Sequence, residues 1–135
     1  MPDPKRAHAE QRLRHEKVAW LTTVRRDGQP QSSPVWFLWR AGEVVVYSRP
    51  TTQKVRNVRA NPRVAVHLRD IDEGSDIVSL EGEAVIDERY PQAAAIPAYV
   101  DKYRSMIADL KMDPVGFAKA YSTPIRIRPV RLRIE

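Results

Sequence analysis

Residues 44–66 read VVVYSRPTTQKVRNVRANPRVAV and predict a strand, a short helix and a second strand. The β-branched residues at the start of this stretch are typical of a strand. Thr51 or Thr52 is a suitable N-cap for the helix. The helix should end before Pro62, because the residue before a proline avoids the helical region. Alternating valines then predict the second strand at residues 63–69.

The flanking sequence continues with further strands and tight turns. Asp27-Gly28 indicates a hairpin, because this pair supplies the positive φ that tight hairpins need, and Gly42 indicates another turn. The predicted strands are residues 18–24, 35–39, 44–47, 63–69, 78–86 and 123–134. The predicted flanking helices are residues 4–17, 91–110 and 114–121. This order predicts a mainly β, six-stranded antiparallel barrel with short helices, in a single domain spanning residues 1–135.

The last predicted strand, TPIRIRPVRLRI at residues 123–134, changes the phase of its alternation at Pro129. A shift by one residue at a proline predicts a β-bulge. The intervening arginines have two interpretations, a solvated outer face or a basic rail for an anionic tail or nucleic acid. They are Arg126, Arg128, Arg131 and Arg133.

The strands at residues 35–39 and 44–47 are apolar on both faces. This is unusual in an antiparallel sheet unless the second face is also covered. We expect a second subunit to pack against the outside of the barrel there. The aromatic side chains of these strands are predicted to serve the core and the dimer contact, although a stacking surface for a ring system is the alternative. They are Trp36, Phe37, Trp39 and Tyr47.

The composition excludes several classes of protein. The chain of 135 residues contains no cysteine, which excludes a disulfide scaffold, a thiolate metal site and a cysteine nucleophile. Its 23 Lys and Arg outnumber 17 Asp and Glu, and the net charge of +6 attracts anions of any kind. No apolar run approaches the ~18 residues that cross a bilayer. The charged N-terminus lacks a secretory signal, so a cytoplasmic protein is expected.

The segment from Ser48 to Lys54 is a candidate anion site. A strand ends, the chain turns at Pro50, and a helix begins whose free N–H groups and dipole favour negative charge. Lys54 opposes this dipole, and a bound phosphate would reverse the penalty. The alternative is that Lys54 points into solvent and the threonines only cap the helix.

Other catalytic signatures are missing from the sequence. Ser32 and Ser33 have no GxSxG context, and neither GxxxxGK[ST] nor GxGxxG occurs. The histidines lack metal-ligand spacing. No catalytic residue and no metal ligand are therefore predicted.

The order of these features resembles the flavin- and deazaflavin-binding split-barrel family related to pyridoxamine 5′-phosphate oxidase. The resemblance rests on the Asp27-Gly28 hairpin and on three stretches of sequence. These are QPQSSPVWFLW at residues 29–39, VVVYSRPTTQKVRNVRANPRVAV at residues 44–66 and VSLEGEAVI at residues 78–86. Its most specific part is KVRNVRANP at residues 54–62. The resemblance implies an FMN-binding split barrel, and the chain looks most like the branch that uses the deazaflavin coenzyme F-420.

The resemblance also implies a homodimer with a cofactor site at the subunit interface. The cofactor ring would lie against Ser33, Pro34, Val35 and Trp36. Tyr47 and Ser48 would line the same pocket. The residues implied around the cofactor phosphate are Thr51, Thr52, Gln53, Lys54, Arg56 and Asn57.

One departure from the family pattern favours F-420 over FMN as the cofactor. Where the oxidase carries a Ser-Arg-Lys run, this chain has Thr52-Gln53-Lys54, so the arginine that would clamp the FMN phosphate is replaced by glutamine. The resemblance thus implies a reductase that transfers hydride from F-420 to a small organic substrate, without metal or membrane. The alternatives are an FMN-dependent flavoprotein, a non-catalytic carrier of F-420 and, ranked last, a small barrel that binds nucleic acid.

Overall fold

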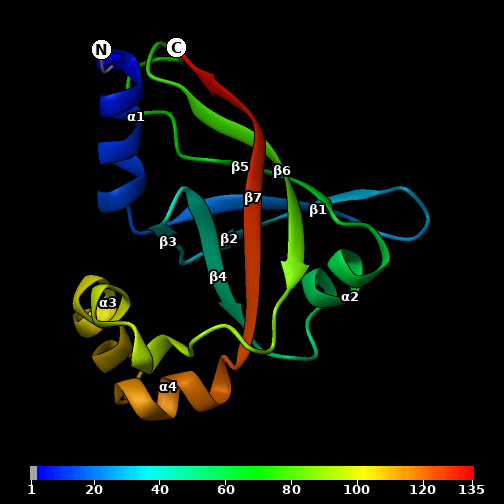
Figure 1. The fold of residues 1–135 in the computed structure, drawn as a ribbon, viewed down its shortest axis with the longest axis vertical. Helices are drawn as coiled ribbons and strands as arrows, with labels where there is room; N and C mark the ends of the chain where they lie inside the picture. The colour runs from blue at the N-terminus through cyan, green and yellow to red at the C-terminus, as the bar shows by residue number, and fades with distance from the viewer. Residues whose placement is uncertain (1–2) are drawn as a thin grey trace.

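The computed structural model describes residues 3–135, which form one curled, seven-stranded antiparallel sheet with short helices around it (Figure 1). The strands are β1 (Ala19–Val24), β2 (Pro30–Val35), β3 (Leu38–Arg40), β4 (Glu43–Ser48), β5 (Arg63–His67), β6 (Val78–Ile86) and β7 (Thr123–Ile134). Their order across the sheet is β2-β1-β5-β6-β7-β4-β3. The predicted mainly β, antiparallel split barrel is confirmed, with seven strands in place of six.

The helices lie outside this sheet and at its ends. They are α1 (Pro4–His15), α2 (Gln53–Ala60), the 3-10 turn η1 (Ala93–Ala95), α3 (Pro97–Asp109) and α4 (Pro114–Ala120). In residues 3–135 none of the helices combines the length and the apolar character needed to cross a membrane.

The predicted strand at residues 35–39 is interrupted at Trp36 and Phe37, and its end belongs to β3. The extra strand is β2, which lies almost wholly before the predicted strand and shares only Val35 with it. The Phe37 N–H donates to Tyr103 Oη at 2.8 Å, and the Phe37 carbonyl accepts from Lys102 Nζ at 2.8 Å. These backbone groups therefore bond to α3 instead of a neighbouring strand.

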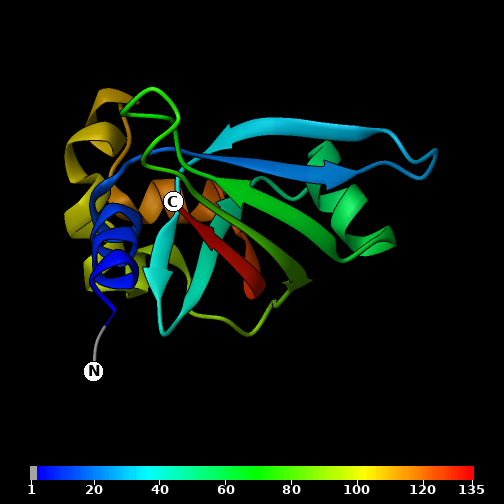
Figure 2. The same cartoon turned by 90° about the horizontal axis from the view of Figure 1, so that it is seen from above.

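The interruption also explains how the barrel closes. β2 and β3 are the two edges of the sheet, yet only Trp36 and Phe37 separate them in the chain. Three Cα–Cα steps span at most about 11 Å. The edges must therefore meet at this point, and the sheet curls through its full width to bring them together (Figure 2).

Both predicted hairpin turns are present. Gly28, between β1 and β2, has a φ of 88°. Ala41 and Gly42, between β3 and β4, have φ of 53° and 75° and join the paired residues Arg40 and Glu43. Positive φ at both central residues gives a two-residue hairpin the twist of its flanking strands.

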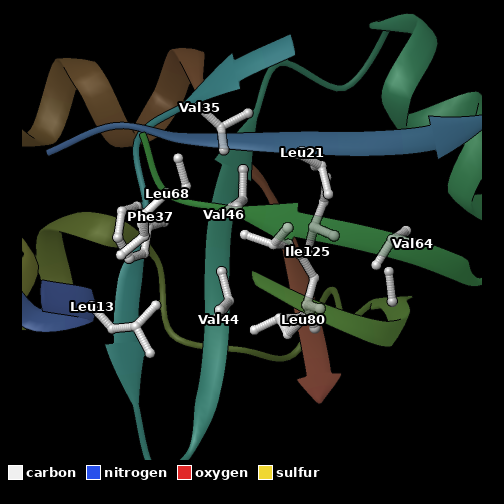
Figure 3. Packing of buried hydrophobic residues seen from close by; sticks show 14 of the residues in the cluster. Leu13, Leu21, Val35, Phe37, Val44, Val46, Val64, Leu68, Leu80 and Ile125 are labelled. Carbon is white, nitrogen blue, oxygen red and sulfur yellow. The ribbon is translucent and has the colours of Figure 1, made fainter. Parts of the chain in front are cut away.

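The main core fills the inside of the curled sheet. Figure 3 shows Leu21 of β1, Val46 of β4 and Ile125 of β7 meeting there. The predicted inward residues of α2, Val55 and Val58, join this core and are 1% and 4% exposed.

A second apolar cluster covers the outer face of β3 and β4. Leu38, Val45 and Tyr47 pack there against Tyr99 of α3 and Phe117 of α4. The chain's own helices thus cover the face for which the strand pattern predicted a second subunit. That expectation was wrong about the covering element, because a pattern shows that a face is buried but not what buries it.

The predicted bulge at Pro129 is confirmed. Glu81 pairs with Arg131 and the next residue of β6, Gly82, pairs with Pro129, so Val130 is the extra residue of β7. The alternation had placed Val130 on the same face as Leu132 and Ile134, which was wrong, because Val130 is 62% exposed whereas those two residues pack against the main core.

Candidate functional site

A cavity of about 400 Å³ opens where the end of β4, the start of α2 and the β2–β3 interruption meet α3 and α4. Volumes of this size are typical of small-molecule sites. It is lined by Pro34, Val35, Trp36, Val46, Tyr47, Ser48, Arg49, Thr52, Lys54, Tyr99, Leu110, Phe117 and Tyr121.

The polar end of the cavity is formed by Ser48, Thr52 and Lys54. Thr52 occupies the N-cap position of α2, as predicted, but its side chain makes no capping hydrogen bond. Its hydroxyl instead lies 2.8 Å from Ser48 Oγ. The N–H groups at the start of α2 therefore have no side-chain cap, which suits them to an anion.

Lys54 contributes a cation to the same end of the cavity. Its side chain is half-buried, and desolvation lowers the pKa of its amine below the ordinary value. Within residues 3–135 no carboxylate forms an ion pair with it. An anion in the cavity would supply the missing counter-charge and restore the pKa.

The opposite wall of the cavity is aromatic. The Trp36 ring lies between the rings of Tyr103 and Phe117, with centroid distances of 4.9 and 5.4 Å and interplanar angles of 4° and 13°. Phe117 stacks on Tyr121 at 4.5 Å, and the Arg49 guanidinium lies 4.7 Å from the Tyr121 ring centroid. The stacked rings of Trp36, Phe117 and Tyr121 thus give the cavity an aromatic wall, and Arg49 adds positive charge beside it.

Two buried tyrosines, Tyr47 and Tyr99, also line the cavity. Tyr47 donates its hydroxyl to the Pro91 carbonyl at 2.6 Å, and its ring meets Tyr99 edge-on at 5.0 Å. The Tyr99 hydroxyl is buried and has no hydrogen-bond partner among the described residues. Burial raises the pKa of both phenols above the ordinary value, so they stay protonated at neutral pH.

The cavity gathers seven of the twelve residues that the resemblance implied. These are Pro34, Val35, Trp36, Tyr47, Ser48, Thr52 and Lys54. Ser33, Thr51, Gln53, Arg56 and Asn57 do not line it.

The residues outside the cavity have structural partners of their own. Asn57 is buried and donates to Thr23 Oγ1 at 2.9 Å, while its side-chain oxygen accepts from Gln53 Nε2 at 2.8 Å. Arg56 donates to the Thr51 carbonyl at 2.7 Å and to Gln53 Oε1 at 2.8 Å. These bonds fasten the start of α2 to the loop before it and to β1.

Sequence reasoning missed six residues of the cavity, most of which belong to α3 and α4 or follow them directly. The missed residues are Val46, Arg49, Tyr99, Leu110, Phe117 and Tyr121. A signal was present in the four-residue spacings of Tyr99 with Tyr103 and of Phe117 with Tyr121, which place each pair on one helix face.

Metal-binding geometry is not found among residues 3–135, where no three His, Asp or Glu side chains are grouped to hold an ion. His8 instead pairs with Asp76 at 2.7 Å. Glu83, an exposed glutamate of β6, pairs with Arg128 at 3.2 Å.

The family model for pyridoxamine 5′-phosphate oxidase matches residues 6–134. The chain belongs to this family. A comparison with curated proteins finds no match.

Solved structures of similar fold differ in what their names describe. An F-420 reductase is 24% identical, with a TM-score of 0.69 and 98% of each chain covered. A conserved hypothetical protein from Mycobacterium tuberculosis is 23% identical, with a TM-score of 0.76 and coverage of 98% of this chain and 84% of that one. The heme storage protein HutZ from Vibrio cholerae is 17% identical, with a TM-score of 0.64 and coverage of 98% and 93%. At such identities the likeness concerns the fold, and the ligand must be argued from the site.

Proposed function

We propose that this member of the family is a cytoplasmic reductase that binds coenzyme F-420 in the cavity and reduces a small organic substrate. The observation that carries the proposal is the half-buried Lys54 amine, which has no carboxylate partner in the described chain and stands beside the uncapped start of α2. A phosphate-bearing cofactor with a flat ring matches this charge and the aromatic wall. The residues present therefore fit the group.

The chain's own residues would bind and orient this cofactor. Lys54 and the first N–H groups of α2 would hold the phosphate, with Ser48 and Thr52 beside it. The main chain at Pro34 and Val35 would face the ring, and the stacked Trp36 would keep water from it. When bound, the coenzyme supplies the hydride. The accompanying proton would come from solvent.

Gln53 supports F-420 over FMN in this proposal. Its side chain bonds to Asn57 and Arg56 and does not line the cavity. The arginine expected of an FMN-binding oxidase thus has no substitute at this position. The basic side chains that line the cavity are Arg49 and Lys54.

We also propose that the working unit is a homodimer with the cofactor near the interface. Because α3 and α4 cover the outer face of β3 and β4, the partner would pack elsewhere. The outer face of β1 offers Trp20, which is 39% exposed beside His67 of β5. Trp20→Ser should weaken the dimer, so that analytical ultracentrifugation detects more monomer than in the wild type. An unchanged association constant would contradict this arrangement.

Cofactor binding is tested by titrating the protein with F-420 and, separately, with FMN, and by following cofactor fluorescence. Removing the charge in Lys54→Gln should weaken F-420 binding about tenfold to a hundredfold, since a hydrogen bond to a charged group contributes about 1.5–3 kcal/mol. Lys54→Arg should retain most of the affinity. Lys119→Gln, which changes an exposed lysine of α4, is the matched control.

The possible results separate the candidate functions. Preference for FMN would assign flavin chemistry to the cavity, and wild-type affinity in Lys54→Gln would show that the phosphate anchor is wrong. A non-catalytic carrier is the second candidate, because a protein named for heme storage shares this fold and no catalytic side chain is required for carriage. If small organic acceptors oxidise the bound, reduced F-420 in a single-turnover experiment, the protein is a reductase. If none of them oxidises it, the protein is a carrier.

A further inference from the structure

Three of the four arginines of β7 form ion pairs, and Arg131 has no ion-pair partner among residues 3–135. Arg126 pairs with Glu43 at 2.9 Å and with Asp87 at 3.0 Å. The remaining ion pairs of the strand are Arg128 with Glu83 at 3.2 Å and Arg133 with Glu135 at 3.0 Å. The expected basic rail is thus largely neutralised by carboxylates of the same chain.

Unbalanced positive charge lies elsewhere, in a hollow between the β1–β2 hairpin and the exposed side of α2. In Figures 1 and 2 the hairpin and α2 lie at the same end of the molecule. We call this feature the hairpin hollow. It is lined by Arg25, Arg26, Asp27, Gln53, Arg56, Asn57, Arg59 and Ala60.

Two carboxylates offset part of the charge of its four arginines. Asp27 pairs with Arg25, and Glu88 pairs with Arg59 at 3.5 Å. Among residues 3–135, neither Arg26 nor Arg56 has an ion-pair partner. The hairpin hollow therefore keeps a net positive charge that the β7 face lacks.

The hollow and the cavity share the start of α2. Thr52 and Lys54 line the cavity, whereas Gln53 and Arg56 line the hollow. Gln53, Arg56 and Arg59 recur at every third position, which places them on one side of the helix. Each step of three residues advances about 4.5 Å along the helix axis. Lys54 does not belong to this row, because it lines the cavity and residues two apart do not share a helix face, so the start of α2 lies between the two sites.

We propose that the hairpin hollow is a second anion site, which binds an extended chain bearing several carboxylates. Guanidinium groups suit this ligand, because each can donate two parallel hydrogen bonds to a carboxylate or phosphate. Two sources offer such a chain. One is the acidic tail of the coenzyme, which rests on the proposed function, and the other is a free oligoanion.

The test compares two double variants with equal charge change. Arg26→Gln with Arg59→Gln alters the hollow, and Arg128→Gln with Arg133→Gln alters β7. Each is titrated with F-420, with the same coenzyme lacking its glutamates, and with a hexaglutamate peptide, at low and high salt. We expect the hollow variant to bind tailed F-420 about threefold to tenfold more weakly at low salt, as two exposed ion pairs allow. Tail-free coenzyme should bind as in the wild type, and the β7 variant should match the wild type throughout.

The hexaglutamate arm reports on the hollow even if F-420 does not bind at all. If the hollow variant loses hexaglutamate binding, but the wild type binds tailed and tail-free F-420 equally well, the ligand of the hollow is a free oligoanion. Equal losses in both variants, or none in either, would overturn the proposal. A single-stranded oligonucleotide that binds the hollow more tightly than hexaglutamate would overturn it in favour of nucleic acid.

Discussion

Tyr99 and Tyr103 are buried one helical turn apart on α3, and removing their hydroxyls should have different effects on stability. The Tyr103 hydroxyl accepts from the Phe37 N–H at 2.8 Å and lies 2.7 Å from the Lys17 carbonyl. Tyr103→Phe leaves the buried Phe37 N–H without a partner. Orphaning one such group costs about 1–3 kcal/mol.

The Tyr99 hydroxyl is equally buried but has no partner in the described chain. Tyr99→Phe removes no hydrogen bond, so the free energy of unfolding should stay within about 0.5 kcal/mol of wild type or rise. It is the matched control for Tyr103→Phe, since both changes delete one oxygen from a fully buried ring.

Thermal and urea unfolding, each followed by tryptophan fluorescence, measure the difference. For a chain of this length, Tyr103→Phe should lower Tm by roughly 4 °C for each kcal/mol lost. The m-value should not change. Equal destabilisation by both variants, or stability of Tyr103→Phe equal to wild type, would refute the assignment of the strand interruption to this hydroxyl.

Three further perturbations test other parts of the structure. Burial lowers the pKa of Lys102 to about 8, below the 10.5 of the unfolded chain, so the unfolded state holds more protons between these values. The stability of wild type relative to Lys102→Met should therefore rise from pH 8 to pH 10, as urea titrations at each pH would show. Arg12→Met should cost about 3 kcal/mol in thermal unfolding, because the buried Arg12 bonds to Asp76 and two other residues. Gly82→Ala should cost about 1–3 kcal/mol in the same assay, since its Cβ would lie 2.7 Å from the Arg128 carbonyl oxygen.

Features set by local sequence were predictable. Thr52 opens α2, Pro62 follows its end, and Gly28 and Gly42 take positive φ in hairpins. The bulge at Pro129 also followed from a local change of alternation. Each of these depends on neighbours within a few residues, which is the range over which a pattern carries information.

Features set by distant partners were not predictable. The interruption at Phe37 depends on Tyr103, 66 residues later, and the strand propensity of the segment gives no sign of it. The cavity was anticipated where Lys54 follows a strand end, but its aromatic wall depends on how Phe117 meets Trp36. The charges of β7 looked free in the sequence because their carboxylate partners come from other strands and loops.

The position of β7 in the sheet has a consequence for how the chain acquires its structure during synthesis. β7 lies between β6 and β4, although it is the last strand in chain order. Until Thr123–Ile134 leaves the ribosome, β2-β1-β5-β6 and β4-β3 are separate sheets whose facing edges are unpaired. Open edges invite pairing with other chains, and distant pairings form slowly. The nascent chain is therefore most exposed to aggregation just before its last strand emerges, and chaperone protection would matter most at that moment.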